Sequence, residues 1–279
     1  MQLPRVVAGL ARSTHPGPTV AVTLVGSLVG FAVGLDTLRI GLVALTILTN
    51  QLSIGLSNDW LDAARDRAVG RTDKPIARGD VSIVTVRGAA IVTLAVSLAT
   101  GFFLGTATGL ANLLFVSCGW LYNAGLKSSL ASTLMYAIAF GTLPAIATFA
   151  LPSPTAPAAW AIALGALLGV AAHFANVLPD LDDDRRTGIR ALPHILGPRR
   201  AGVFTFVVLA AASVIALIGP RGDASAVQWL GAAACLGITA AGTALVLTRP
   251  PTRTLFRLIM AAALVDVAVL AAAGERMLA

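Results

Sequence analysis

Nine apolar stretches, each about 20 residues long, follow one another along the chain with only short polar segments between them. An α-helix needs about 20 apolar residues to cross roughly 30 Å of hydrocarbon. We therefore expect membrane-spanning helices near residues 18–37, 39–58, 84–105, 107–123, 131–151, 158–178, 201–219, 227–247 and 255–273. No stretch long enough for a separate soluble domain remains. The sequence predicts an all-α membrane protein whose nine transmembrane helices form one domain, residues 1–279.

Composition excludes the other broad classes. Apolar residues make up 57% of the 279 residues and charged residues 12%, whereas a soluble domain carries roughly 25% charged residues. Disorder is excluded by the high apolar content. The two cysteines, Cys118 and Cys235, lie inside apolar stretches, so we expect them to be small buried side chains and not a disulfide or metal site.

Basic residues fall almost entirely on one side of the predicted membrane topology. Of the 20 lysines and arginines, 17 lie on the side of the N-terminus, and only Arg39, Arg221 and Arg276 face the other way. Because basic loops stay in the cytoplasm, we expect an uncleaved first helix, a cytoplasmic N-terminus and an external C-terminus in the cell membrane. The net charge of +7 then reflects topology and anionic membrane lipid, and it does not require a nucleic acid partner.

Two acidic clusters stand where the second and sixth predicted helices reach the cytoplasm. Nine of the 12 aspartates fall there, and each cluster contains the spacing Asn-x3-Asp-x3-Asp. Positions i, i+4 and i+8 of an α-helix advance by only about 40° per step, so each set would lie along one helix face. The first acidic ladder is Asn58, Asp62 and Asp66, and the second acidic ladder, 118 positions later, is Asn176, Asp180 and Asp184.

Carboxylates this close together need a cation. They repel one another and are costly at a membrane boundary unless they are paired, protonated or bound to metal. Hard oxygen ligands suit Mg²⁺, which usually completes its shell with water and substrate phosphate. Two ladders on one side of the membrane predict two metal clusters with a diphosphate between them. The alternative is a solvated surface on which acids merely balance bases, but the repeated spacing favours the metal site.

A diphosphate site at the mouth of an apolar bundle indicates a substrate with a charged head and an apolar tail. Isoprenyl diphosphates fit, because metal ions neutralise the charge that develops as the allylic C–O bond ionises. The bundle would surround a central cavity open to the cytoplasmic side, with the tail in contact with the bilayer. Trp60, Trp120, Tyr122 and Phe174 lie near cytoplasmic helix ends, where they would either stabilise a carbocation or form an interfacial belt.

On these motifs the chain resembles the UbiA superfamily of intramembrane prenyltransferases, over essentially its whole length. That family has nine transmembrane helices, a first motif N-D-x-x-D-x-x-x-D, a second motif D-x-x-x-D, and a tyrosine shortly before a basic residue after the fourth helix. The matching residues are Asn58, Asp59, Asp62 and Asp66, then Asp180 and Asp184, and finally Tyr122 and Lys127 within LYNAGLK.

The resemblance implies a role for each of these positions. It implies that diphosphate-bridged Mg²⁺ is coordinated by Asn58, Asp62, Asp66, Asp180 and Asp184. Lys127 and Tyr122 would join the four aspartates as catalytic residues, and the substrate would also contact Asn58, Lys74, Arg78, Asn176 and Arg190. Lys74 stands where relatives more often have Arg, which replaces a forked guanidinium by a single ammonium.

The acceptor of the prenyl group is less constrained. An acceptor with phosphates of its own would need further cationic residues inside the spans, so an apolar or aromatic acceptor is favoured. A UbiA-type terpene cyclase, which converts the prenyl diphosphate without an acceptor, is the alternative. A cation transporter fits less well, since transporter sites usually lie at the bilayer midplane. Donor chain length and oligomeric state stay open.

Two ionisable residues lie inside predicted spans, His173 in the sixth and Asp266 in the ninth. We expect His173 either to remove a proton during the reaction or to bond a neighbouring helix. An ionisable group in a span usually faces the bundle interior. Asp266 is therefore expected to bond a Ser, Thr or Asn on a facing helix.

Overall fold

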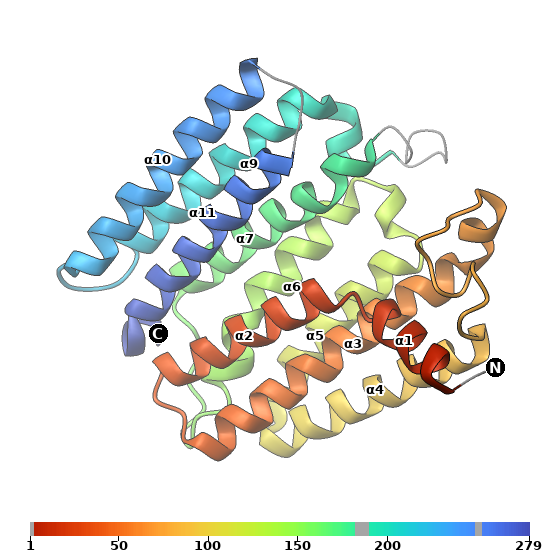
Figure 1. Cartoon of the computed structure of the whole chain (residues 1–279). Coiled ribbons are helices and arrows are strands. Elements are labelled where there is room, and N and C mark those ends of the chain that lie inside the picture. The colour runs from red at the N-terminus through yellow and green to blue at the C-terminus, as the bar shows by residue number, and fades with distance from the viewer. Residues whose placement is uncertain (1–2, 182–189, 249–252) are drawn as a thin grey trace.

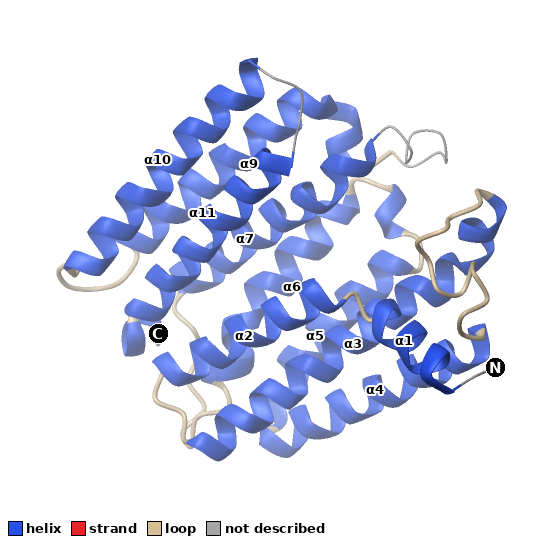
Figure 2. Ribbon diagram, in the orientation of Figure 1, coloured by secondary structure: helices blue, strands red, loops and turns tan. Residues whose placement is uncertain are grey.

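A computed structural model describes residues 3–181, 190–248 and 253–279. Within these ranges the chain consists of helices and connecting loops (Figure 2). One isolated β-bridge joins Pro157 and Leu278 in this described part of the chain. The helices are α1 (Leu3–Ser13), α2 (Pro16–Ala32), α3 (Thr37–Ala68), α4 (Ile83–Leu104), α5 (Thr106–Asn123), α6 (Ala131–Thr148), α7 (Ala159–Val177), α9 (Leu192–Ile218), α10 (Ala226–Thr248) and α11 (Arg253–Ala272), and 3₁₀ turns lie at Leu126–Ser128, Leu178–Asp180 and Gly274–Met277.

Each apolar stretch predicted from the sequence coincides with a helix, from α2 to α7 and from α9 to α11. Six of the described helices, α3, α4, α6, α7, α9 and α10, are long and apolar enough to cross a membrane, and α2 is apolar but shorter, at 17 residues. The prediction of an all-α multi-pass protein is therefore confirmed. The number of nine crossings stays a prediction.

Helix boundaries follow from local capping chemistry. Asp36 accepts a hydrogen bond from the backbone N–H of Arg39 at 2.9 Å and begins α3, and Ser82 does the same for Thr85 at 3.0 Å and begins α4. A single residue, Gly105, separates α4 from α5. Its φ of 141° is open to glycine and strained for other residues, which permits this short connection.

Consecutive helices pack side by side, and α11 also contacts α2 and α7, which closes the bundle (Figure 1). The helices α3 and α7 end at the same end of the bundle, opposite the C-terminus of the chain. We call this the ladder end. Large apolar side chains are exposed on the outer faces, among them Leu38, Phe103 and Ile218, each more than 70% exposed. Such a surface suits contact with lipid.

A small second core lies apart from the main core of the bundle. It consists of Leu56, Ala63, Ile76, Val81, Val86 and Ala90. Val6 and Leu10 of α1 pack against it, as do Trp60 and Trp120. This second core joins α1 and the loop of residues 69–82 to the ends of α3 and α4.

Candidate functional site

The helix α3 is longer than a membrane crossing requires. Its 32 residues span about 48 Å, whereas the hydrocarbon core is roughly 30 Å thick. The predicted span ended near residue 58, but the helix continues without interruption to Ala68. The first acidic ladder therefore lies on the last turns of one rigid helix, as its spacing predicted.

Each member of the first ladder occupies a different environment. Asn58 donates from Nδ2 to Oδ1 of Asn123 at 3.1 Å, and Asp62 forms an ion pair with Lys127. Asp66 is buried, with 4% of its surface exposed. The ladder is thus covered by neighbouring elements and is not a freely solvated acidic surface.

Lys127 reaches the ladder because the chain turns sharply after α5. Gly125 has a φ of 150° and precedes the 3₁₀ turn that contains Lys127. The side chains of Lys127 and Asp62 are only 12% and 16% exposed. The structure therefore brings together two residues that the sequence singled out separately.

The basic loop of residues 69–82 places its cations differently. Lys74 donates from Nζ to Oδ1 of Asp59 at 2.6 Å, and Arg78 contacts Oδ2 of Asp80 at 3.1 Å. Hydrogen bonds from Arg71 to Asp73, at 2.7 and 2.8 Å, lower the pKa of the Asp73 carboxyl to about 2. Lys74 is bonded to the aspartate beside the ladder, and Arg78 lies at the end of the loop.

A row of polar and aromatic contacts links the ends of α3, α5, α6 and α7. Asn123 of α5, which receives the bond from Asn58, is adjacent in sequence to Tyr122. The Tyr122 ring lies 5.2 Å from the ring of Tyr136, and the hydroxyl of Tyr136 accepts a hydrogen bond from Asn176 at 3.1 Å. This row connects the first member of one ladder to the first member of the other.

The second ladder is described only in part. Asn176 is the next-to-last residue of α7 and is exposed. The α-helix ends at Val177 and a 3₁₀ turn follows at Leu178–Asp180, so this ladder does not lie on one uninterrupted α-helix. Asp184 lies outside the described residues, as do its neighbours Asp182 and Asp183, and of Asp180 only the backbone is described. Arg190 is described and exposed.

Several contact residues were not found from the sequence. His15 contacts Asp59, Asn123 bonds the first ladder, and Tyr136 bonds the second. The positions of His15 next to Pro16 and of Asn123 next to Tyr122 were the available signals. Neither spacing shows which side chains meet across helices.

The two ionisable residues inside predicted spans both have helix partners. Nε2 of His173 lies 3.1 Å from the hydroxyl of Ser132 on α6. Asp266 accepts a hydrogen bond from Ser213 on α9 at 2.6 Å, as expected for a packing role. The His173 ring also lies 4.9 Å from the Tyr136 ring. His173, Tyr136 and Tyr122 therefore form a row of neighbouring rings, which we call the aromatic row. Asp266 instead joins α11 to α9.

The first ladder supplies the oxygen ligands that Mg²⁺ prefers, two carboxylates and one amide. Within the ranges 3–181, 190–248 and 253–279 no group of three or more His, Cys, Asp or Glu side chains is close enough to hold a metal ion. A groove of about 370 Å³ lies between α9 and α10 and is lined by Leu196, Arg199, Arg200, Val203, Phe204, Val207 and Leu247. None of these residues belongs to the predicted site.

The chain is similar to known proteins in sequence and in fold. Residues 19–273 match the UbiA prenyltransferase family. The chain belongs to this family. The match covers nearly all of the chain and contains the residues of both ladders. The family resemblance seen in the motifs is therefore confirmed.

Related UbiA sequences have diverse names. The chain is 29% identical over 181 residues to the bacteriochlorophyll synthase 33 kDa chain of Cereibacter sphaeroides, an alignment that covers 61% of this chain and 60% of that protein. It is 28% identical over 201 residues to the digeranylgeranylglyceryl phosphate synthase of Pyrococcus abyssi, with 67% of each chain covered. The alignment with the first of these relatives thus spans about 60% of its length.

Solved UbiA structures share the fold over nearly the full chain. A UbiA homologue from Archaeoglobus fulgidus bound to GPP and Mg²⁺ has a TM-score of 0.73 at 16% identity, covering 95% of this chain and 99% of that one. A UbiA homologue from Aeropyrum pernix K1 has a TM-score of 0.72 at 19% identity, covering 95% and 97%. At these identities the likeness establishes the fold.

Proposed function

We propose that this chain is a Mg²⁺-dependent intramembrane prenyltransferase. It would ionise an isoprenyl diphosphate, transfer the prenyl group to an aromatic or other apolar acceptor, and release diphosphate. The observation that carries the proposal is the first acidic ladder on the projecting end of α3, with Lys127 at Asp62, in a chain of the UbiA family. The relatives support it, since one Archaeoglobus homologue was solved with GPP and Mg²⁺.

The metal would be held by residues from both ladders, namely Asn58, Asp62, Asp66, Asp180 and Asp184. When bound, Mg²⁺ neutralises charge on the diphosphate as the C–O bond breaks. The carboxylates of the first ladder fit this group because they are hard oxygen donors spaced along one helix face. The partly buried position of Asp62 limits competition from water.

The basic residues would bind the diphosphate directly. The ammonium of Lys127 has three donors, and those not used by Asp62 are available to phosphate oxygens. Lys74 likewise keeps donors beyond the one bonded to Asp59. Arg78, Arg190 and Asn176 complete the proposed binding set, and Arg78 and Arg190 are exposed, as an entry route from the cytoplasm requires.

The aromatic row would face the prenyl chain. Tyr122 and Tyr136 meet edge to face, and their rings offer the electron-rich surfaces that stabilise a carbocation. His173 is bonded to Ser132, and its ring lies tilted against that of Tyr136. In this position it would accept a proton from the acceptor. With its N-terminus and ladder end in the cytoplasm, the protein would draw its donor from the inner leaflet.

The test is diphosphate release by the purified protein in detergent. Geranyl, farnesyl and geranylgeranyl diphosphates would each be supplied with Mg²⁺, with and without a phenolic or quinol acceptor. We expect release that depends on both metal and acceptor and that stops in EDTA. Release without an acceptor, accompanied by a cyclic hydrocarbon, would identify a terpene cyclase instead.

Matched substitutions on α3 separate chemistry from folding. Asp62→Asn should reduce turnover by roughly a hundredfold or more, because it removes the carboxylate charge that would hold Mg²⁺, and Mg²⁺ neutralises the negative charge that develops on the diphosphate. Asp36→Asn, at the other end of the same helix, keeps its capping oxygen and should leave turnover unchanged. Equal activity of the two variants would contradict the metal site.

A further inference from the structure

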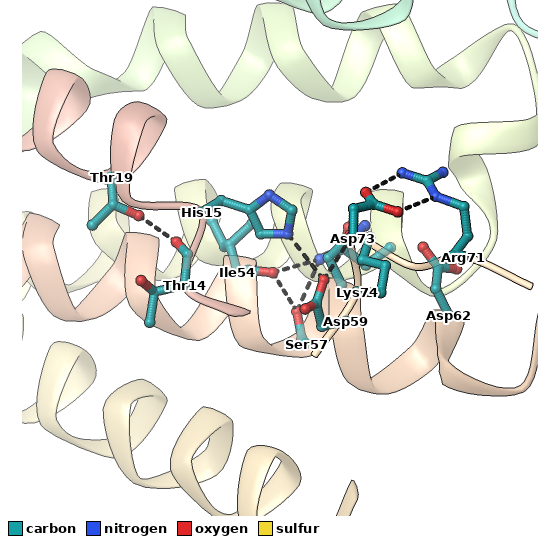
Figure 3. Close-up of polar contacts among 12 residues, drawn as sticks. Thr14, His15, Thr19, Ile54, Ser57, Asp59, Asp62, Arg71, Asp73 and Lys74 are labelled. Carbon is teal, nitrogen blue, oxygen red and sulfur yellow. Dashed lines mark hydrogen bonds and ion pairs between the residues drawn. The ribbon is translucent and has the colours of Figure 1, made fainter. Parts of the chain in front are cut away.

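Asp59 stands beside the first ladder but does not share its face. It follows Asn58 by one residue, which is about 100° around an α-helix. Its side chain is 3% exposed, and a buried carboxylate requires partners to offset its desolvation. The structure supplies two such partners, one that precedes α3 in the sequence and one that follows it (Figure 3).

The two partners are Lys74 and His15. Nζ of Lys74 donates to Oδ1 of Asp59 at 2.6 Å, and Nε2 of His15 lies 3.1 Å from the same oxygen. Lys74 comes from the loop of residues 69–82, and His15 comes from the junction of α1 and α2. One carboxylate oxygen therefore ties both segments to α3.

The junction around His15 is fixed in place by its own contacts. His15 has a left-handed backbone conformation, with φ 52° and ψ 65°. The hydroxyl of Thr19 donates to the carbonyl of Thr14 at 2.7 Å, and a Cβ on Gly55 would lie 2.6 Å from that carbonyl oxygen. Only a glycine on α3 allows the junction to approach so closely, one turn before Asp59.

A second connection holds the other end of the same loop. Nε of Arg5 on α1 donates to Oδ1 of Asp80 at 2.8 Å, while Arg78 contacts the other oxygen of Asp80 at 3.1 Å. Gly9 of α1 packs against Val81, where an added Cβ would lie 3.1 Å from the Val81 Cβ. The segment that carries Lys74 and Arg78 is thus attached to α1 directly at Asp80 and Val81, and at Lys74 it is linked to His15 through Asp59 of α3.

We propose that His15 and Asp59 are positioning residues that orient the ammonium of Lys74 toward the diphosphate. Asp59 takes one N–H of Lys74 and fixes the direction of the other two. His15 fixes the Asp59 carboxylate and holds the α1–α2 junction against α3. This inference rests on the proposed function, because the diphosphate is what Lys74 would contact.

Two substitutions of His15 separate its hydrogen bond from its backbone. Asn tolerates the left-handed conformation but is too short to reach Asp59, whereas Gln carries its amide nitrogen at a distance similar to Nε2 of His. We expect His15→Asn to raise KM for the prenyl diphosphate roughly tenfold with kcat nearly unchanged, the loss of about one charge-assisted hydrogen bond. His15→Gln should largely restore KM.

A readout without turnover follows the loop that carries Lys74. Trypsin does not cleave the Lys74–Pro75 bond, but it can cut after the exposed Arg78 of the same loop. Limited digestion should cut after Arg78 faster in His15→Asn and Asp59→Asn than in wild type, and calorimetry with Mg²⁺ and inorganic diphosphate should show matching losses of affinity. Asp73→Asn is the control, since Asp73 pairs with Arg71 on the exposed part of the same loop. That variant should match wild type in KM and in diphosphate affinity.

The outcomes distinguish the two proposals. If wild type releases diphosphate but His15→Asn and His15→Gln both keep wild-type KM and cleavage, the positioning role is wrong while the prenyltransferase stands. A lower melting temperature with unchanged KM would likewise reduce His15 to a structural residue. If wild type neither binds Mg²⁺ and inorganic diphosphate nor releases diphosphate from any prenyl donor, both proposals fail together.

Discussion

Lys127 forms an ion pair with the carboxylate of Asp62, which the proposed mechanism assigns to metal binding. Its ion pair with Asp62 has little exposure on either side chain, so the ammonium and a divalent cation would compete for the same oxygen. This competition connects two measurable quantities, the Mg²⁺ requirement and the affinity for diphosphate.

We predict that Lys127→Met shifts these two quantities in opposite directions. The Mg²⁺ concentration for half-maximal rate should fall, because the competing ammonium is gone. KM for the prenyl diphosphate should rise about tenfold, because a cation that binds its oxygens is lost. Initial rates over a Mg²⁺ series would measure both, and a shift of the two in the same direction would disagree with this role.

Ser213 makes a different kind of contact, inside the bundle. Its hydroxyl donates to Asp266 at 2.6 Å, and the other carboxylate oxygen of Asp266 has no hydrogen-bond partner among the described residues. We predict that Ser213→Ala lowers the free energy of unfolding by about 1 kcal/mol and leaves activity unchanged.

Unfolding in mixed micelles would measure the effect of Ser213→Ala. Ser27→Ala is the matched control, because in the described part of the chain the Ser27 hydroxyl bonds the carbonyl of Thr23 within its own helix. Equal stability of the two variants would argue that the contact between α9 and α11 contributes nothing.

At the scale of elements, α1 is the helix that hydropathy did not predict. In the sequence, Arg5, Arg12 and the nearby Pro16 indicate only a segment that precedes the first apolar span. Its packing depends on Val6 and Leu10 against the second core and on Arg5 at Asp80. Arg5 and Asp80 are 75 positions apart, so no local sequence pattern contains their contact.

We predict that acid loosens α1. A hydrogen bond from Arg5 and the charge of Arg78 hold the pKa of the Asp80 carboxyl below its ordinary value. A lowered pKa stabilises the folded state above the ordinary Asp range, and this contribution is lost as pH falls through the folded-state pKa. Amide exchange in α1, corrected for intrinsic rates, should therefore rise below about pH 4.

The Arg5→Gln variant provides the control for that acid effect. Without the guanidinium, α1 should exchange faster already at neutral pH and respond less to acid. If wild type and Arg5→Gln show the same pH profile, Asp80 does not hold α1.

The two ladders show how far sequence reasoning reaches. The placement of Asn58, Asp62 and Asp66 on one α-helix was predicted correctly, because the spacing is that of a single helix face. For the second, Pro179 and the 3₁₀ turn at Leu178–Asp180 interrupt the regular spacing after Asn176. Periodicity locates residues on a helix, but it does not show where the helix changes geometry, nor that Asn58 meets Asn123 and Lys74 meets Asp59.

At the scale of the whole molecule, the predicted orientation is open to a direct test. Thr72 is exposed at the ladder end, and Asp223 is exposed between α9 and α10 at the opposite end of the bundle. Single cysteines there, in a background in which the buried Cys118 and Cys235 are replaced by Ala, would report the side of the membrane.

We expect a membrane-impermeant maleimide to label Asp223→Cys in intact cells and Thr72→Cys only after lysis. The reason is that the basic loops gather at the ladder end. Labelling of Thr72→Cys in intact cells would instead show that the ladder end faces the outside of the cell.

The length of α3 has a consequence for the lipid environment. One stiff helix both spans the hydrocarbon and carries Asp62 and Asp66, so the height of these acids above the membrane is set by bilayer thickness and not by a flexible tether. A thicker bilayer would draw the carboxylates toward the acyl chains, where charge is costly, unless the helix tilts less. Reconstitution into lipids of graded chain length should therefore alter catalysis even though no lipid touches the reacting bond.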